Sequence, residues 1–190
     1  MDIRIYFEGV KMLRAGFQSF FAGLQQSARE AKVEISFIAA KDGLSAYRKA
    51  ERTHPAAWNV LLKDSEEPIP NEIGDLLQKH GIDSVLRDHI FWMVELMESW
   101  FLACPEDLAK YYGKGFQSKA IGATQNVESI AKADVQARLR AATRGTVKGA
   151  YNKVKHAPHL WDKLDSERVK ERAPHCRKLF DAALAKLAAS

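Results

Sequence analysis

The sequence predicts an α/β fold: a mostly parallel four-stranded sheet flanked by helices, followed by a basic helical C-terminal portion. Four short runs rich in β-branched and aromatic residues have the length of strands: residues 3–7, 33–39, 58–62 and 89–94. The segments between them are long enough for crossover helices, and strands that alternate with helices pair in parallel. After residue 94 the pattern becomes helical throughout and the charge becomes basic.

The linking segments carry the apolar periodicity of helices. The first link has one apolar face with steps of three and four residues, formed by Leu13, Phe17, Phe20, Phe21, Leu24 and Ala28. The second link shows the same pattern more weakly at Leu44, Tyr47 and Ala50, and the third, 71–82, ends at Gly81, a typical helix stop.

The C-terminal half reads as a series of helices. A helix begins at Pro105 and stops at Gly113, residues 114–132 look irregular, and later helices begin near Ser166 and Pro174. We therefore divide the chain into an α/β layer with its closing helices, 1–112, and a basic helical extension packed on it, 113–190.

Composition indicates a folded protein. Of its 190 residues, 46% are hydrophobic and 28% are charged, close to ordinary globular values. The apolar runs are far shorter than the roughly 20 residues that span a bilayer, and the start, with Asp2, lacks a basic signal-peptide region. Only Cys104 and Cys176 are present, without metal-type spacing. We expect a reducing cytoplasm and no membrane.

The charge is distributed unevenly along the chain. Residues 1–109 hold 12 Lys/Arg and 17 Asp/Glu, whereas residues 110–190 hold 17 and 7. The stretch between Asp134 and Asp162 has no acid but contains Arg138, Arg140, Arg144, Lys148, Lys153 and Lys155. Such a block favours binding of a polyanion such as nucleic acid, although a solvated basic face has the same composition.

Acidic residues follow three of the four predicted strands. Glu8 comes after the first strand, Asp64, Glu66 and Glu67 come after the third, and Glu95 and Glu98 come after the fourth. Parallel sheets gather functional residues at the carboxyl ends of their strands, and Mg²⁺ prefers oxygen ligands. A cation site is one interpretation. Solvated loop acids or helix caps are the other.

The segment "RIYFEG", with the acid-x-acid pair of "LLKDSEEP", resembles the TOPRIM domain of topoisomerases, primases and overcoming-lysogenization-defect (OLD) nucleases. The whole chain, through "MESWFLA", "DLAKYYGKGF" and "KADVQARLRAATRGTVKGAYNKVKHA", is similar to a bacterial family of unknown function with TOPRIM-like character. The resemblance implies that Glu8 is a general acid or base and that Asp64 and Glu66 bind metal. Glu66 departs from the TOPRIM pattern, which has Asp there, and this leaves metal occupancy open.

The first functional hypothesis is a metal-dependent phosphodiesterase, most plausibly a nuclease, that uses Mg²⁺ or Mn²⁺. Glu8, Asp64 and Glu66 would carry catalysis and hold the metal, with Glu98 as a further ligand. Lys41 and Lys63 are candidate phosphate contacts. Arg144, Lys148, Lys153 and Lys155 are candidate nucleic-acid contacts, with Tyr151 as a stacking ring.

The second hypothesis is a catalytically degenerate TOPRIM-like module that binds a partner or nucleic acid. TOPRIM-like relatives are often encoded beside ABC- or AAA-type ATPases in phage-defence systems, so the resemblance implies an ATPase partner. The chain has no Walker sequence GxxxxGK[ST] of its own. A small-molecule phosphotransferase is a weaker third option. A zinc site at His156 and His159 is disfavoured because nothing completes it.

Overall fold

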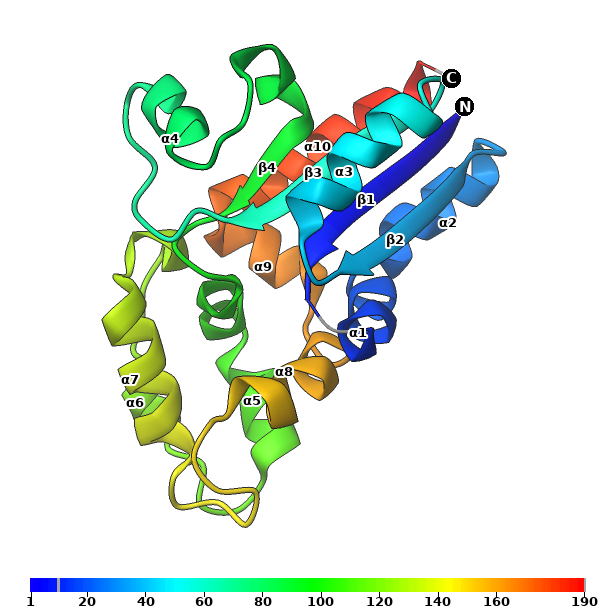
Figure 1. Ribbon diagram of the computed structural model, residues 1–190. Helices are drawn as coiled ribbons and strands as arrows, with labels where there is room; N and C mark the ends of the chain where they lie inside the picture. The colour runs from blue at the N-terminus through cyan, green and yellow to red at the C-terminus, as the bar shows by residue number, and fades with distance from the viewer. Residues whose placement is uncertain (10, 190) are drawn as a thin grey trace.

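The fold is described by a computed structural model that covers residues 1–9 and 11–189. The described residues form one sheet of four parallel strands (Figure 1): β1 (Asp2–Glu8), β2 (Glu34–Ala40), β3 (Trp58–Asp64) and β4 (Ile90–Met93). Their order across the sheet is β2-β1-β3-β4. The TOPRIM-like α/β fold class predicted from the sequence is confirmed. The carboxyl ends of all four strands lie along one edge of the sheet, which faces the helical half of the molecule.

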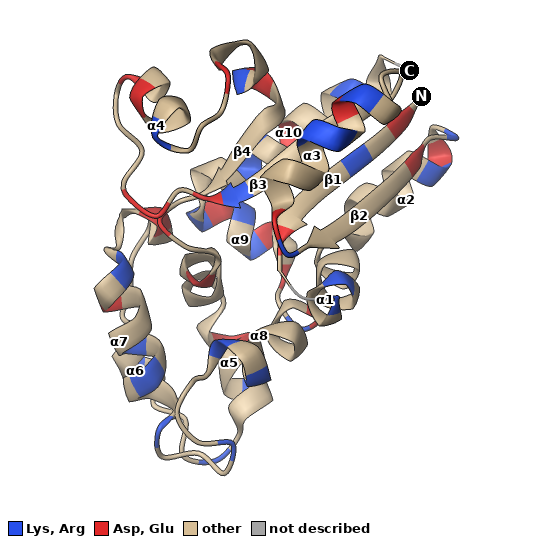
Figure 2. Cartoon of the chain, viewed as in Figure 1, with Lys and Arg blue, Asp and Glu red and all other residues tan. Residues whose placement is uncertain are grey.

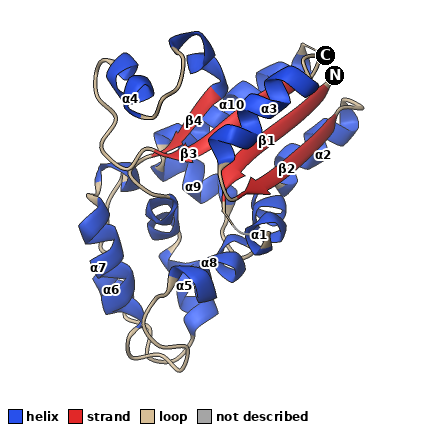
Figure 3. Cartoon of the chain, in the orientation of Figure 1, coloured by secondary structure: helices blue, strands red, loops and turns tan. Residues whose placement is uncertain are grey.

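The helices of the first half connect the strands and cover the sheet (Figure 3). They are α1 (Met12–Phe20), α2 (Ala22–Glu30), α3 (Gly43–Thr53), α4 (Ile73–Lys79) and the 3₁₀ helix η1 (Ser84–His89). Side chains alternate along β1 because successive residues of a strand point to opposite faces. Ile3, Ile5 and Phe7 enter the main core, whereas Tyr6 enters a smaller core beneath α3 and α4.

The described residues of the second half form the 3₁₀ helices η2 (Met97–Ala103) and η3 (Val127–Ser129) and six α-helices. These are α5 (Pro105–Tyr112), α6 (Ser118–Ile121), α7 (Lys132–Thr143), α8 (Lys153–Trp161), α9 (Ser166–Arg172) and α10 (Pro174–Ala188). The helix starts predicted at Pro105, Ser166 and Pro174 are confirmed. The segment 114–132 is less irregular than the sequence suggested, because α6 and η3 lie within it.

One hydrophobic core joins the sheet to the second half. It includes residues of β1, α1 and α2 together with residues of α7, α8 and α10. Helix α10 packs against β4 and α2, where the Phe180 and Phe21 rings stack with their centroids 5.0 Å apart. The four tryptophans are buried. Among the described residues, no helix is both long and apolar enough to cross a lipid bilayer.

Candidate active site

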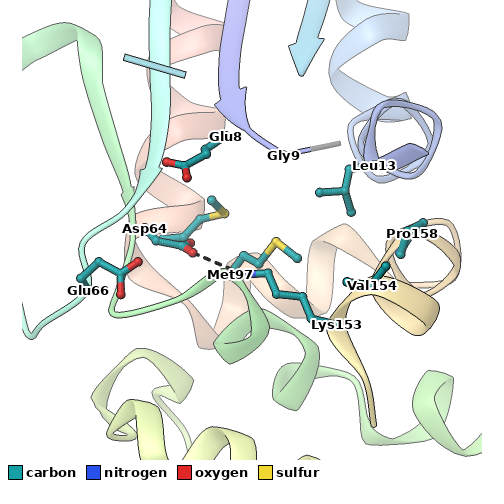
Figure 4. A pocket seen from close by; sticks show the side chains of 10 residues that line it. Glu8, Gly9, Leu13, Asp64, Glu66, Met97, Lys153, Val154 and Pro158 are labelled. Carbon is teal, nitrogen blue, oxygen red and sulfur yellow. Dashed lines mark ion pairs between the residues drawn. The ribbon is translucent and has the colours of Figure 1, made fainter. Parts of the chain in front are cut away.

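Acidic side chains from β1 and β3 line a single cavity of about 260 Å³ at the carboxyl edge of the sheet. Figure 4 shows Glu8, Asp64 and Glu66 on one side of this cavity. The opposite side is apolar and includes Leu13 of α1 and Val154 and Pro158 of α8. The cavity thus has an acidic wall supplied by the sheet and an apolar wall supplied by helices.

A buried serine fastens the exit of β3 to the exit of β4. The Ser65 amide donates to the Met93 carbonyl at 3.1 Å, and its hydroxyl accepts from the Glu95 amide at 2.7 Å. The Glu66 amide donates to the Glu95 carbonyl at 3.0 Å, which extends the ladder beyond the strands. Because both loops are tied together at the backbone, the acids they carry start from a fixed position.

Two of the exit acids have left-handed backbone conformations. Glu66 has φ of 63° and Glu95 has φ of 55°, a region that residues with a Cβ rarely adopt. Such conformations cost about 1–3 kcal/mol each and persist where surrounding contacts enforce them. Here the hydrogen bonds between the two loops provide that enforcement, so the strain is confined to the exits of β3 and β4.

The exit of β1 is shaped by a glycine on the neighbouring crossover. A Cβ on Gly43 would lie 2.9 Å from the Glu8 amide nitrogen and 3.1 Å from the Phe7 carbonyl carbon, so only glycine lets α3 begin this close to β1. Asp42 caps the same helix by accepting from the Ser45 amide at 2.9 Å, which lowers the pKa of Asp42. The acid at position 42 therefore has a structural role.

Each acid of the cavity has a lysine partner. Lys63 lies 3.5 Å from Glu8, and Lys132 at the start of α7 pairs with Glu66. Lys153, the first residue of α8, lies 3.7 Å from Asp64 (Figure 4). The basic second half of the chain thus places an ammonium group inside the acidic site.

The same lysine reaches a buried glutamate behind the cavity. Lys153 Nζ lies 3.4 Å from Glu98 Oε2, and the Tyr151 hydroxyl donates to Glu98 Oε1 at 3.1 Å. Tyr151 is only 8% exposed, and its burial beside Glu98 raises the pKa of its hydroxyl. The stacking role predicted for Tyr151 is wrong, because its ring is in the core.

Burial dominates the electrostatics of Asp64. It raises the pKa of the Asp64 carboxyl to about 7; the charge of Lys153 opposes this rise, while those of Glu98 and Glu66 add to it. Asp64 Oδ1 is buried and has no hydrogen-bond partner among the described residues. A carboxylate oxygen left in this state is costly unless a ligand completes its surroundings.

The fit to a metal ion can be judged from these contacts. Hard cations take carboxylate oxygens, and Asp64 offers one with no hydrogen bond, in a cavity that Glu8 and Glu66 also line. Among the described residues, no three His, Cys, Asp or Glu side chains gather closely enough to form a ready metal centre. The ligand types therefore fit, but the Glu8 and Glu66 side chains would have to leave their lysine partners to share one ion.

Comparison with known proteins decides the family. The sequence matches the family described as Domain of unknown function (DUF4276) over residues 10–182. The chain belongs to this family. Its fold is similar to a solved structure, the C-terminal region of the Burkholderia pseudomallei OLD protein, with a TM-score of 0.55, 11% identity and 98% of each chain covered. At this identity the likeness concerns the fold alone. No curated protein matches the sequence.

In this DUF4276 chain, the other predicted contact residues lie in different surroundings. Lys41 is exposed on the loop after β2, and Lys63 is occupied by Glu8. Arg144, Lys148 and Lys155 are exposed on α8 and the loop before it. The sequence reasoning brought Glu8, Asp64 and Glu66 to one cavity, but it missed Lys132 and assigned Lys153 to a nucleic-acid surface.

A sequence signal for the position of Lys153 exists in hindsight. Asn152 caps α8 by accepting from the Lys155 amide at 3.0 Å, so Lys153 is the first residue of that helix. A second hollow adjoins the first and is lined by Glu98, Gln136, Arg140, Tyr151, Asn152, Lys153 and Val154. Lys153 and Val154 line both hollows, so the acidic cavity continues toward α7.

Proposed function

We propose that this chain is a Mg²⁺- or Mn²⁺-dependent nuclease of the TOPRIM type. The observation that carries the proposal is the meeting of Glu8, Asp64 and Glu66 at one cavity, where an Asp64 oxygen is buried without a hydrogen bond. The fold shared with the C-terminal region of an OLD protein supports it. Asp64 and Glu66, with Glu8, would hold the metal, and Glu98 would be a further ligand.

The side chains of the cavity would position the substrate and set the charge of the acidic groups. A divalent ion contributes neutralisation of the phosphate charge and activation of a water molecule. Glu8, whose side chain is 61% exposed at the cavity, is the group that can carry a proton to or from the reacting oxygen. Lys153 favours the ionised form of Asp64 against its burial. The apolar wall of Leu13, Val154 and Pro158 suits a sugar or base.

The test is a cleavage assay with matched carboxamide variants. Labelled single-stranded DNA, duplex DNA and tRNA are incubated with the purified protein and Mg²⁺, Mn²⁺ or EDTA. We expect Asp64→Asn and Glu8→Gln to lose activity by about 100-fold or more, as removal of a group central to catalysis does. Glu67→Gln is the control, because Glu67 also lies in the loop after β3 but pairs with Lys79 and does not line the cavity. Metal-dependent products that are equal for all four proteins would show a contaminating nuclease and refute the proposal.

A second candidate is a catalytically degenerate TOPRIM-like module. It is favoured by one observation: every acid of the cavity already has a lysine partner, so the site is neutralised without a metal. In this case the chain would serve as a subunit beside an ABC- or AAA-type ATPase, in a phage-defence system, and would bind it or nucleic acid.

Calorimetry separates the two candidates. Titration of Mn²⁺ into wild-type protein and into Asp64→Asn at pH 8 should show uptake that the variant lacks if the site is catalytic. No uptake by wild type, combined with stable co-elution of the chain with an ATPase encoded beside it, would favour the module. Because the Asp64 pKa is raised to about 7, any uptake should strengthen as the pH rises from 6 to 8.

A further inference from the structure

A third hollow, which we call the basic hollow, lies on the far side of α8 from the acidic cavity. It has a volume of about 360 Å³ and is lined by Asp107, Lys110, Tyr111, Lys148 and Lys163. Three ammonium groups therefore face one carboxylate. Figure 2 shows basic residues on the loops at the end of the molecule farthest from the sheet.

The hollow has an ordered basic group that lacks a carboxylate partner. Lys148 Nζ lies 5.1 Å from the centre of the Tyr111 ring, a cation–π contact, and no ion pair is found for it in the described part of the chain. Lys110 and Lys163 each pair with one acid, at 3.1 and 2.6 Å respectively, and both remain more than half exposed. An anion that enters the hollow would meet the positive charge of Lys148, which no carboxylate in the described part of the chain neutralises.

The loop that carries Lys148 is held in place by a backbone contact. The loop 113–117 packs against the loop 144–149, and a Cβ on Gly115 would lie 2.1 Å from the Gly145 carbonyl oxygen. Gly115 also has φ of +91°, in the region where only glycine is unstrained. The two loops therefore fit together only with glycine at this position, and Lys148 is presented from a defined backbone.

Helix α8 separates the basic hollow from the acidic cavity. Val154 and Pro158 line the acidic cavity, whereas His159, five residues after Val154, stacks near Tyr111 at 6.5 Å and 20° on the other side. At 100° per residue these positions belong to different faces of the helix. A helix with its side chains is about 10–12 Å across, which corresponds to roughly three nucleotide steps of about 3.4 Å.

An acidic cavity repels the phosphodiester that it would cleave, so the binding energy must come from elsewhere. We propose that the basic hollow of Lys110, Tyr111, Lys148 and Lys163 is a second nucleic-acid site, which grips backbone phosphates and holds the strand across α8 toward the acidic cavity. The path of the strand toward the acidic cavity rests on the proposed nuclease function. The binding it requires is measurable without cleavage.

The test is fluorescence anisotropy of labelled oligo(dT) of 12 nucleotides in EDTA, at several salt concentrations. We expect Lys148→Gln/Lys163→Gln to weaken binding by about 10-fold or more and to reduce the salt slope by about 1.4, because two contacts to single-strand phosphates are lost. The control is Lys49→Gln/Lys178→Gln, which removes the same charge from exposed positions on α3 and α10 and should change binding by less than about 2-fold. Urea unfolding of each variant confirms that the fold is retained.

Each outcome decides the matter. Equal binding by the wild type and Lys148→Gln/Lys163→Gln would refute the proposed site. Equal weakening in the control variant would refute it as well, because it would show a general effect of net charge. Inorganic pyrophosphate that competes as strongly as the oligonucleotide would show a small-anion site instead of a nucleic-acid site. A protein that binds through the hollow but never cleaves would leave this inference standing and refute the proposed nuclease.

Discussion

Two buried glutamates show how differently this fold uses the same side chain. Glu128 and Glu98 each have only 2% of the side chain exposed. Glu128 accepts three hydrogen bonds, from Trp100 Nε1, the His175 amide and His175 Nδ1, all at 2.9 Å. Glu98 accepts one, from Tyr151, and its Oε2 has no hydrogen bond in the described structure, with only Lys153 nearby.

The difference shows which buried carboxylate receives its hydrogen bonds from the protein itself. Glu128 ties η3 to η2 and to the start of α10, and its oxygens are saturated by N–H donors from these elements. Glu98, with Asp64, keeps an oxygen without a hydrogen bond beside a cavity wall. Since buried polar atoms are nearly always satisfied, the free oxygens of Glu98 and Asp64 are the ones that the proposed ligand would complete.

The largest effect should come from the saturated glutamate. Glu128→Gln places an NH₂ group against N–H donors and removes charge-assisted hydrogen bonds, so we expect it to lower the free energy of unfolding by about 3–5 kcal/mol. Urea unfolding followed by tryptophan fluorescence measures this. The matched control is Glu167→Gln, whose side chain is 73% exposed and which should stay within about 0.5 kcal/mol. Similar losses in both variants would contradict the comparison.

The next effect is the pH dependence of Asp64. Its folded pKa, about 7, lies above the ordinary 3.8, so the folded protein binds this proton more tightly than the unfolded chain. The stability it contributes is full below pH 4, falls as the pH rises to about 7, and is constant above that.

Asp64→Asn removes this dependence. In EDTA we expect the variant to be more stable than wild type by about 2–4 kcal/mol at pH 8, with a smaller difference at pH 5. Urea midpoints of both proteins from pH 4 to 9 test the sign. A variant that loses stability at pH 8 would show that the Asp64 charge is better compensated than its contacts indicate.

A smaller effect should follow from removing the lysine between the acids. Lys153→Met leaves Asp64 and Glu98 without their common cation, and we expect a loss of about 1–3 kcal/mol at pH 8, reduced because half of the lysine side chain is exposed. Lys155→Met, two residues along α8 and exposed, is the control. The loss should shrink at pH 5, where Asp64 is protonated, and a loss that is constant with pH would mean that packing, not charge, is responsible.

The smallest effect on stability is expected for Glu98→Gln. The amide oxygen can still accept from Tyr151, and a buried charge disappears, so the change in unfolding free energy should stay within about 1 kcal/mol. Mn²⁺ calorimetry on the same variant sharpens the comparison with Glu128→Gln. A loss of stability as large as that of Glu128→Gln would contradict the comparison, because it would show that the Glu98 carboxylate also stabilises the fold.

The sheet and its acidic edge could be predicted from local patterns. Strand-length apolar runs, helical periodicity between them and the rule for parallel strands were enough to bring Glu8 and Asp64 to one edge. The Asn152 cap indicates that Lys153 begins a helix, but the choice of Lys153 as the cation of the acidic cavity could not be predicted in the same way. That choice depends on where α8 docks against α1, which is tertiary information.

Backbone conformation at the site was equally out of reach. Nothing in "DSEEP" signals that Glu66 is left-handed, since this conformation is imposed by hydrogen bonds to the β4 exit. Tyr151 lies in a polar, basic stretch that indicates a surface, yet its hydroxyl finds Glu98 in the core. Both features arise where long-range contacts override local preference.

The return of α10 to the sheet affects the order in which the chain can fold. Phe180 packs beside Phe20 and Phe21, so these two rings lack part of their packing until the fifteen-residue α10 has been synthesised. A nascent chain carrying only the four strands exposes an aromatic surface to other proteins in the meantime. Contacts between residues far apart in the sequence thus close this part of the core, and such contacts form more slowly than local ones.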